Sequence, residues 1–161
     1  MILERLKQNS SIKRKFGVHG RIKLKLKDGS EKMIYTLESP WDFNEDEKNG
    51  IVGLSCVNEG SYDIVIEESP VMGIKVPFIV NPSLNVQLRQ KDNAIDRTGH
   101  ALVPKNDIDV FHIYGRYILI GSDILRHNEG FYEPTDGTIA LSYLMEHIKE
   151  NGDNKLVIKW L

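Results

Sequence analysis

A strictly alternating run near the start of the chain constrains the fold more than any other feature. Residues 21–27 read Arg-Ile-Lys-Leu-Lys-Leu-Lys, so apolar and basic side chains alternate with a period of two. That period is typical of a β-strand with one buried face. Asp28-Gly29 follows, and residues 33–37 form a second strand-like run. Because Asp-Gly between two such runs is a strong hairpin signal, we predict an antiparallel hairpin here.

Several later segments also have strand-like patterns. Residues 51–57 and 62–66 flank a turn-forming stretch and predict a second hairpin. Pro77 has no N–H to donate, so the strand that contains it should lie at a sheet edge or at a bulge. Residues 91–107 are polar and irregular, which predicts a long loop. The remaining predicted strands are 72–80, 84–88 and 109–120.

Two segments space their apolar residues as helices do. Residues 2–8 place three apolar side chains on one helical face and predict a short N-terminal helix. Residues 138–150 form a longer amphipathic pattern, and a final strand is predicted over 155–161. We therefore predict a single domain over residues 1–161 of the α+β class. Its sheet should be mainly antiparallel and built from hairpins, with a short N-terminal helix and one amphipathic helix before the last strand.

Charge is distributed unevenly along the chain. Residues 1–32 hold ten basic and three acidic residues, a net charge of +7, whereas the rest hold eleven basic and twenty acidic residues, a net charge of −9. Such asymmetry can mark a surface for an acidic partner or a nucleic acid. It can equally let the basic end pack near the acidic remainder, in the same copy or in a second one. The candidate partner-binding cations are Arg21, Lys23, Lys25 and Lys27.

An acidic segment with two aromatic residues is a second candidate for partner binding. Residues 41–47 read Trp-Asp-Phe-Asn-Glu-Asp-Glu. Exposed Trp41 and Phe43 in a polar loop would be typical anchors of a protein interface. Both rings could instead be part of the core, with only the charges in water.

The chain contains no motif of a common enzyme class. It lacks G-x-x-x-x-G-K-[ST], G-x-S-x-G and H-E-x-x-H. Its densest group of acid–base side chains lies within 107–133, where carboxylates and histidines could perform general acid–base catalysis or bind a divalent metal. The spacing matches no established ligand pattern, and a half-exposed strand with a polar face explains the same residues. The candidate catalytic residues are Asp109, His112, Asp123 and His127.

These patterns favour a non-enzymatic protein that binds another macromolecule. A protein partner or a second copy is favoured, a metal-dependent or acid–base hydrolase is the first alternative, and non-specific nucleic-acid binding is the second. The single cysteine, Cys56, cannot close an intramolecular disulfide. Apolar runs are far shorter than the roughly 20 residues of a membrane span. We therefore expect a cytoplasmic protein with no cofactor, no metal and no membrane partner.

Overall fold

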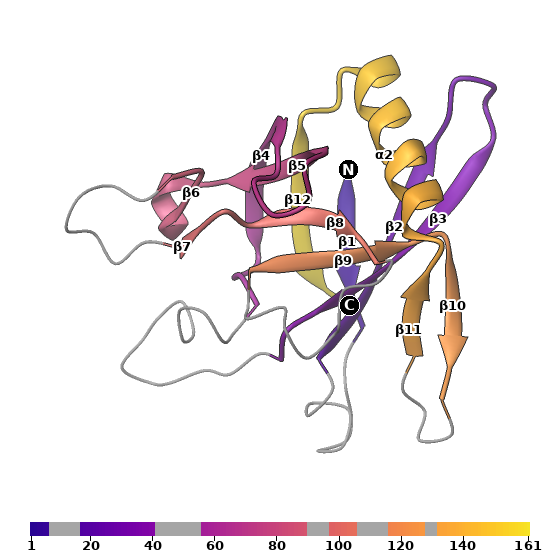
Figure 1. The fold of residues 1–161 in the computed structure, drawn as a ribbon, viewed down its shortest axis with the longest axis horizontal. Helices are drawn as coiled ribbons and strands as arrows, with labels where there is room; N and C mark the ends of the chain where they lie inside the picture. Colours follow the sequence, from indigo (N-terminus) through magenta and orange to yellow (C-terminus); the bar gives the residue numbers. More distant parts are fainter. Residues whose placement is uncertain (7–16, 41–55, 90–96, 106–115, 128–131) are drawn as a thin grey trace.

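The fold is a closed β-barrel with one long helix (Figure 1). A computed structural model describes residues 1–6, 17–40, 56–89, 97–105, 116–127 and 132–161. Each strand of the barrel is hydrogen-bonded to the next, and the last returns to the first. The order around the barrel is β1 (Ile2–Arg5), β12 (Lys155–Trp160), β4 (Gly60–Glu68), β5 (Lys75–Val80), β8 (Ala101–Pro104), β9 (Tyr117–Gly121), β3 (Glu31–Glu38) and β2 (Val18–Lys25).

The remaining elements are attached to this barrel. The hairpin of β10 (Asp123–Arg126) and β11 (Tyr132–Thr135) forms a separate two-stranded sheet. A second small sheet pairs β6 (Val86–Gln87) with β7 (Arg97–Thr98), after the short 3-10 helix η1 (Pro82–Leu84). Helix α2 (Gly137–Asn151) precedes β12 and contacts β8, β9 and β2. Within the described ranges, the structure has no helix that is long and apolar enough to cross a membrane.

The predicted α+β class and the predicted N-terminal helix are wrong, and both errors have one cause. Residues 2–5 form β1, which pairs in parallel with β12 and antiparallel with β2, and so closes the barrel. An isolated helix of two turns is marginal in water. As a strand, the same segment has backbone partners on both sides: Val157 N donates to Met1 O at 3.0 Å, and Leu6 N donates to His19 O at 2.8 Å.

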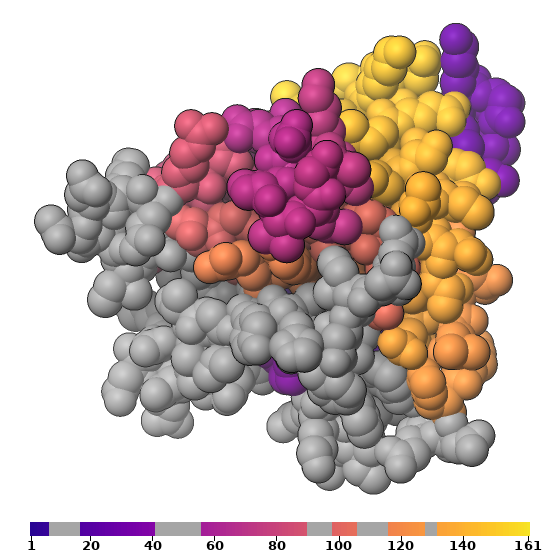
Figure 2. Space-filling view, in the orientation of Figure 1, coloured from indigo at the N-terminus to yellow at the C-terminus, as the bar shows by residue number. Residues whose placement is uncertain are grey.

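The first predicted hairpin is confirmed as β2 and β3. Leu26 N donates to Ser30 O at 2.9 Å across the turn, and the Asp28 carboxylate accepts from Ser30 N at 2.8 Å. Gly29 takes a φ of 83°, which disfavours other residues. The alternation also gives the correct faces, because Ile22 and Leu24 are buried while Lys23 and Lys25 are exposed. The hairpin projects beside α2 (Figures 1 and 2).

The predictions for the end of the chain are confirmed, whereas the strand that contains Pro77 is not an edge strand. The amphipathic pattern is α2, Gly152 ends it with a φ of 59°, and the last strand is β12. Pro77 lies in β5, between β4 and β8, and not at an edge. Ile79 N donates to His100 O at 2.9 Å, so the nitrogen of Pro77 faces the same neighbour, β8. The proline is tolerated because the β5–β8 pairing is limited to Phe78 and Ala101.

The other predicted strands have mixed outcomes. The segment 84–88 is a strand only at β6 (Val86–Gln87), because Leu84 ends η1 and Asn85, with a φ of 59°, interrupts the alternation. The 91–107 segment contains β7 and β8. Residues 51–55 and 106–115 lie outside the described residues, so the strands predicted over them stay predictions. The pairing predicted for the second hairpin is wrong, because β4 lies between β12 and β5. The hairpin partner that the structure does show for β4 is β5.

The apolar residues form two clusters that cover the barrel unevenly. One fills the interior and includes Ala140 and Leu144 of α2. The other lies on the outer side of β5, β8 and β9, so these strands are buried on both faces. Strands β12, β1 and β2 instead alternate between buried and solvent-facing residues. The outer cluster comprises Leu37, Val76, Phe78, Ala101, Val103 and Leu119.

Candidate functional site

The most distinctive surface is formed by the solvent-facing side chains of β12, β1 and β2. Alternate residues of these strands point into the barrel, so the residues between them project together from its outer side. We call this surface the basic outer face. Its members are Ile2, Glu4, Arg21, Lys23, Lys25, Lys155, Val157 and Lys159.

Two apolar residues lie at the centre of the basic outer face. Ile2 and Val157 are register partners on the parallel strands β1 and β12. Their exposed fractions are 46% and 38%, respectively. Single exposed apolar residues are ordinary on a protein surface, but two adjacent ones inside a ring of charges resemble the centre of an interface.

The charges of the face are only partly compensated. Glu4 contacts both Arg21, at 3.2 Å, and Lys159, at 3.7 Å. Lys23 pairs with Glu31 at 2.8 Å, and both side chains are mostly exposed. Lys155 pairs with Asp63 at 3.1 Å. Exposed pairs of this kind are worth about 0–1 kcal/mol, so a partner can displace them at little cost.

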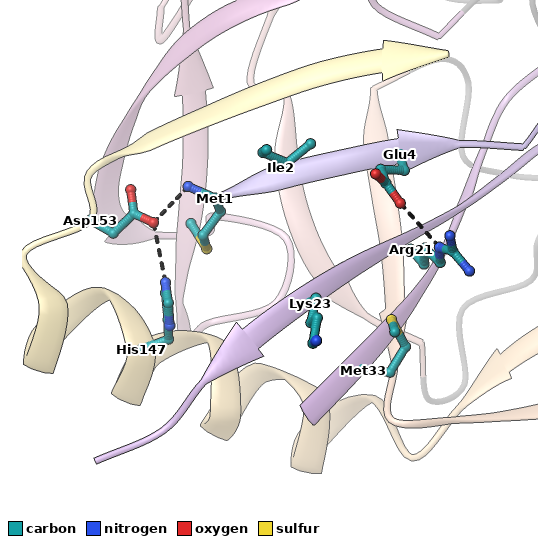
Figure 3. A pocket seen from close by; sticks show the side chains of 8 residues that line it. All are labelled: Met1, Ile2, Glu4, Arg21, Lys23, Met33, His147 and Asp153. Carbon is teal, nitrogen blue, oxygen red and sulfur yellow. Dashed lines mark hydrogen bonds and ion pairs between the residues drawn. The ribbon is translucent and has the colours of Figure 1, made fainter. Parts of the chain in front are cut away.

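A pocket of about 470 Å³ opens on this face and extends to the end of α2 (Figure 3). Its apolar lining comes from Met1, Ile2 and Met33. Lys23 and Met33 lie between the Glu4–Arg21 pair and the His147–Asp153 pair (Figure 3). The pocket therefore combines apolar lining residues with two cations, Arg21 and Lys23.

The wall of the pocket nearest α2 is held by His147. Its Nε2 lies 3.1 Å from Asp153 Oδ2, and its Nδ1 lies 2.8 Å from Lys25 O. Asp153 also accepts from the Met1 nitrogen at 2.6 Å. Burial alone would raise the pKa of Asp153, but the hydrogen bonds from the Met1 nitrogen and His147 outweigh it and lower that pKa. Since both ring nitrogens of His147 are engaged, the residue fixes this wall of the pocket.

The structure places the predicted cations in two locations. Arg21, Lys23 and Lys25 lie on the basic outer face, as the alternation predicts. Lys27 is exposed in the turn beyond β2, where its backbone N donates to Glu146 Oε1 at 3.3 Å. Trp41 and Phe43 lie outside the described residues.

The two described members of the candidate catalytic set are not brought together. Asp123 begins β10 and accepts from Ile124 N at 2.8 Å, whereas His127 follows β10 and lies 2.9 Å from Glu133. Four extended residues separate them by about 13 Å. Asp109 and His112 lie outside the described residues. Across the part of the chain that the structure describes, no three His, Cys, Asp or Glu residues gather as metal ligands would.

A buried ion pair inside the barrel escaped the sequence analysis. Arg5 Nε and Nη2 donate to the two carboxylate oxygens of Glu38 at 2.6 and 2.8 Å, and Nη2 also donates to Val57 O at 2.7 Å. Burial lowers the pKa of Arg5, but the adjacent Glu38 carboxylate more than offsets this and raises it. The available signal was the apolar Leu3 two residues before Arg5, which puts both on one face of a strand.

Comparison with known proteins gives no relative to guide the assignment. No protein-family model matches the chain, and neither a curated protein nor a solved structure matches it.

Proposed function

We propose that this protein is non-enzymatic and acts by binding a partner protein through the basic outer face. The observation that carries the proposal is the exposed pair Ile2 and Val157, surrounded by the cations of β2 and β12. Protein interfaces typically combine an apolar centre, which loses contact with water on binding, with a polar rim that orients the partner. A partner with acidic groups around an apolar side chain would complement this surface.

Nucleic-acid binding is the second candidate, because cations along a strand can follow phosphates. Two observations favour a protein instead. The face contains no aromatic side chain on which a base could stack, and the exposed apolar pair at its centre, Ile2 and Val157, offers nothing to a phosphate. The acid–base alternative is not carried further, since Asp123 and His127 lie at opposite ends of β10. We also propose a cytoplasmic location, which the cysteine content supports, because the single Cys56 of the sequence cannot close an intramolecular disulfide.

The test compares three immobilised versions of the full chain: wild type, Lys23→Glu on the face, and Arg89→Glu as control. Arg89 is a matched control because it also forms an exposed ion pair, with Glu67 at 3.3 Å, and lies beyond β6. Proteins retained from a cell extract are identified and purified, and their affinity for each version is measured. We expect Lys23→Glu to weaken the interaction about tenfold or more, while Arg89→Glu leaves it unchanged.

Two results would contradict the proposal. The first is a purified partner that binds Lys23→Glu and wild type equally. The second is retention that depends on nucleic acid, disappears after nuclease treatment and falls steeply with salt, because counterion release dominates nucleic-acid binding.

A further inference from the structure

The basic outer face specifies what its occupant must contain, if the proposed function holds. The apolar lining residues of the pocket, Ile2 and Met33 among them, call for an apolar side chain. Arg21 and Lys23, which also line it, call for carboxylates a few residues away from that side chain. The occupant is therefore a short acidic segment that carries at least one large apolar residue.

The chain itself contains such a segment. Residues 41–47 hold four carboxylates, no basic residue and two aromatic side chains, Trp41 and Phe43. It is the most acidic stretch of the sequence, and it lies outside the described residues. We propose that residues 41–47 of a second copy of this chain dock on the basic outer face. This inference rests on the proposed function and names the partner.

The positions of the described residues around the segment explain why a second copy is required. Ile2, Lys23 and Met33 lie at one level of the barrel, because the register places Lys23 opposite Met33 and Leu3 opposite Ile22. Pro40, which precedes the segment, is seven residues beyond Met33, or about 23 Å along an extended chain. Phe43 lies three residues after Pro40 and can reach at most about 11 Å from it. Within one copy, this chain length keeps both aromatic residues away from Ile2 and Met33, the apolar part of the pocket.

The charges favour the same arrangement. The segment has a net charge of −4, and the face holds five cations, of which four contact carboxylates of their own copy at the surface. Docking exchanges those exposed pairs for pairs with the segment, while an aromatic ring covers Ile2 and Val157. Since each copy carries both a face and a segment, two copies can make the contact twice, as in a symmetric dimer.

The first experiment uses a fluorescein-labelled synthetic peptide of residues 41–47 as the probe and the full chain as the receptor. Fluorescence anisotropy should show binding that Lys23→Glu weakens about tenfold or more and that Arg89→Glu leaves within about twofold. Peptides with both aromatics changed to alanine, or with all four acids changed to their amides, should lose binding. Equal binding of the peptide to wild type and Lys23→Glu would overturn the proposed site.

The second experiment measures the mass of the full chain in solution by light scattering over a concentration series. Wild type should self-associate, whereas Lys23→Glu and the double variant Trp41→Ala/Phe43→Ala should each be monomeric. An equimolar mixture of these two variants should form a heterodimer, because one supplies the intact segment and the other the intact face. If the double variant fails to fold, Asp42→Asn/Glu45→Gln keeps both aromatics and tests the same contact.

The outcomes separate this inference from the proposed function. A wild-type chain that stays monomeric throughout the series overturns the second copy as the occupant, whatever the peptide does. The proposed function then still depends on the retention experiment, in which a different acidic protein would lose affinity for Lys23→Glu. If no protein distinguishes Lys23→Glu from wild type either, the proposed function fails as well.

Discussion

Removing one member of the Arg5–Glu38 pair should destabilise the barrel more than any change at its surface. Both side chains are buried, and the carboxylate accepts two of the three hydrogen bonds that the guanidinium donates. Changing Arg5→Met leaves Glu38 as a buried charge without its partner. Breaking a buried pair in this way costs about 3–5 kcal/mol. Because domains are typically stable by about 5–15 kcal/mol, the variant should unfold at a much lower urea concentration.

The double variant Arg5→Met/Glu38→Leu tests the reasoning behind that magnitude. Apolar replacement of both partners removes the buried charges together, and such replacements are often neutral or stabilising. Among the described residues the guanidinium Nη1 has no hydrogen-bond partner, so replacing Arg5 breaks no hydrogen bond at that nitrogen. Urea denaturation followed by circular dichroism should show that the double variant regains most of the stability lost by Arg5→Met. A loss below about 1 kcal/mol for Arg5→Met, the range of an exposed pair, would refute the argument.

Three further predictions follow from particular contacts. Burial and, to a smaller extent, the neighbouring Tyr35 raise the pKa of Tyr132 from 10.0 to about 12. The contribution of Tyr132 to stability should therefore be present below pH 10 and be lost as the pH rises toward 12. In unfolding curves measured between pH 10 and 12, Tyr132→Phe should remove this loss of stability. The lowered pKa of Asp153 has the opposite sign, so its contribution is present above its ordinary value of 3.8 and is lost as the pH falls through its folded pKa; Asp153→Asn should flatten the acid side of the melting-temperature profile. In Gly121→Ala the new methyl group would collide with the Thr135 backbone, which should cost about 1–3 kcal/mol in urea denaturation, and an unchanged midpoint would disprove the close approach.

The predictions that succeeded depend on neighbouring residues. The β2–β3 hairpin needs only an alternating run and an Asp-Gly turn, and α2 needs only its own periodicity. Barrel closure depends instead on pairing residues 2–5 with β12, about 150 positions later in the chain. The segment around Leu3 fits both a helix and a strand, and only its distant partners decide between them.

The same distinction applies to the candidate site. The alternation of β2 predicted where Arg21, Lys23 and Lys25 project, because side-chain direction is a local property. The apolar centre was not predicted, since Ile2 was assigned to a helix and Val157 is adjacent only after the barrel closes. Pro77 is a second case in which distant residues decide the outcome. The short β5–β8 pairing, which the sequence does not show, allows a proline inside the barrel.

Closure of the barrel also determines how a partner can be recognised. Strand β1 pairs with β12 along its whole length and with β2 from Leu3 to Arg5, so at the centre of the basic outer face no row of backbone N–H and C=O groups is free for an added strand. A protein that binds over β1 must therefore be selected there by side chains. Point substitutions on β12, β1 and β2 can then change the choice of partner while the backbone hydrogen bonding of the barrel stays as it is.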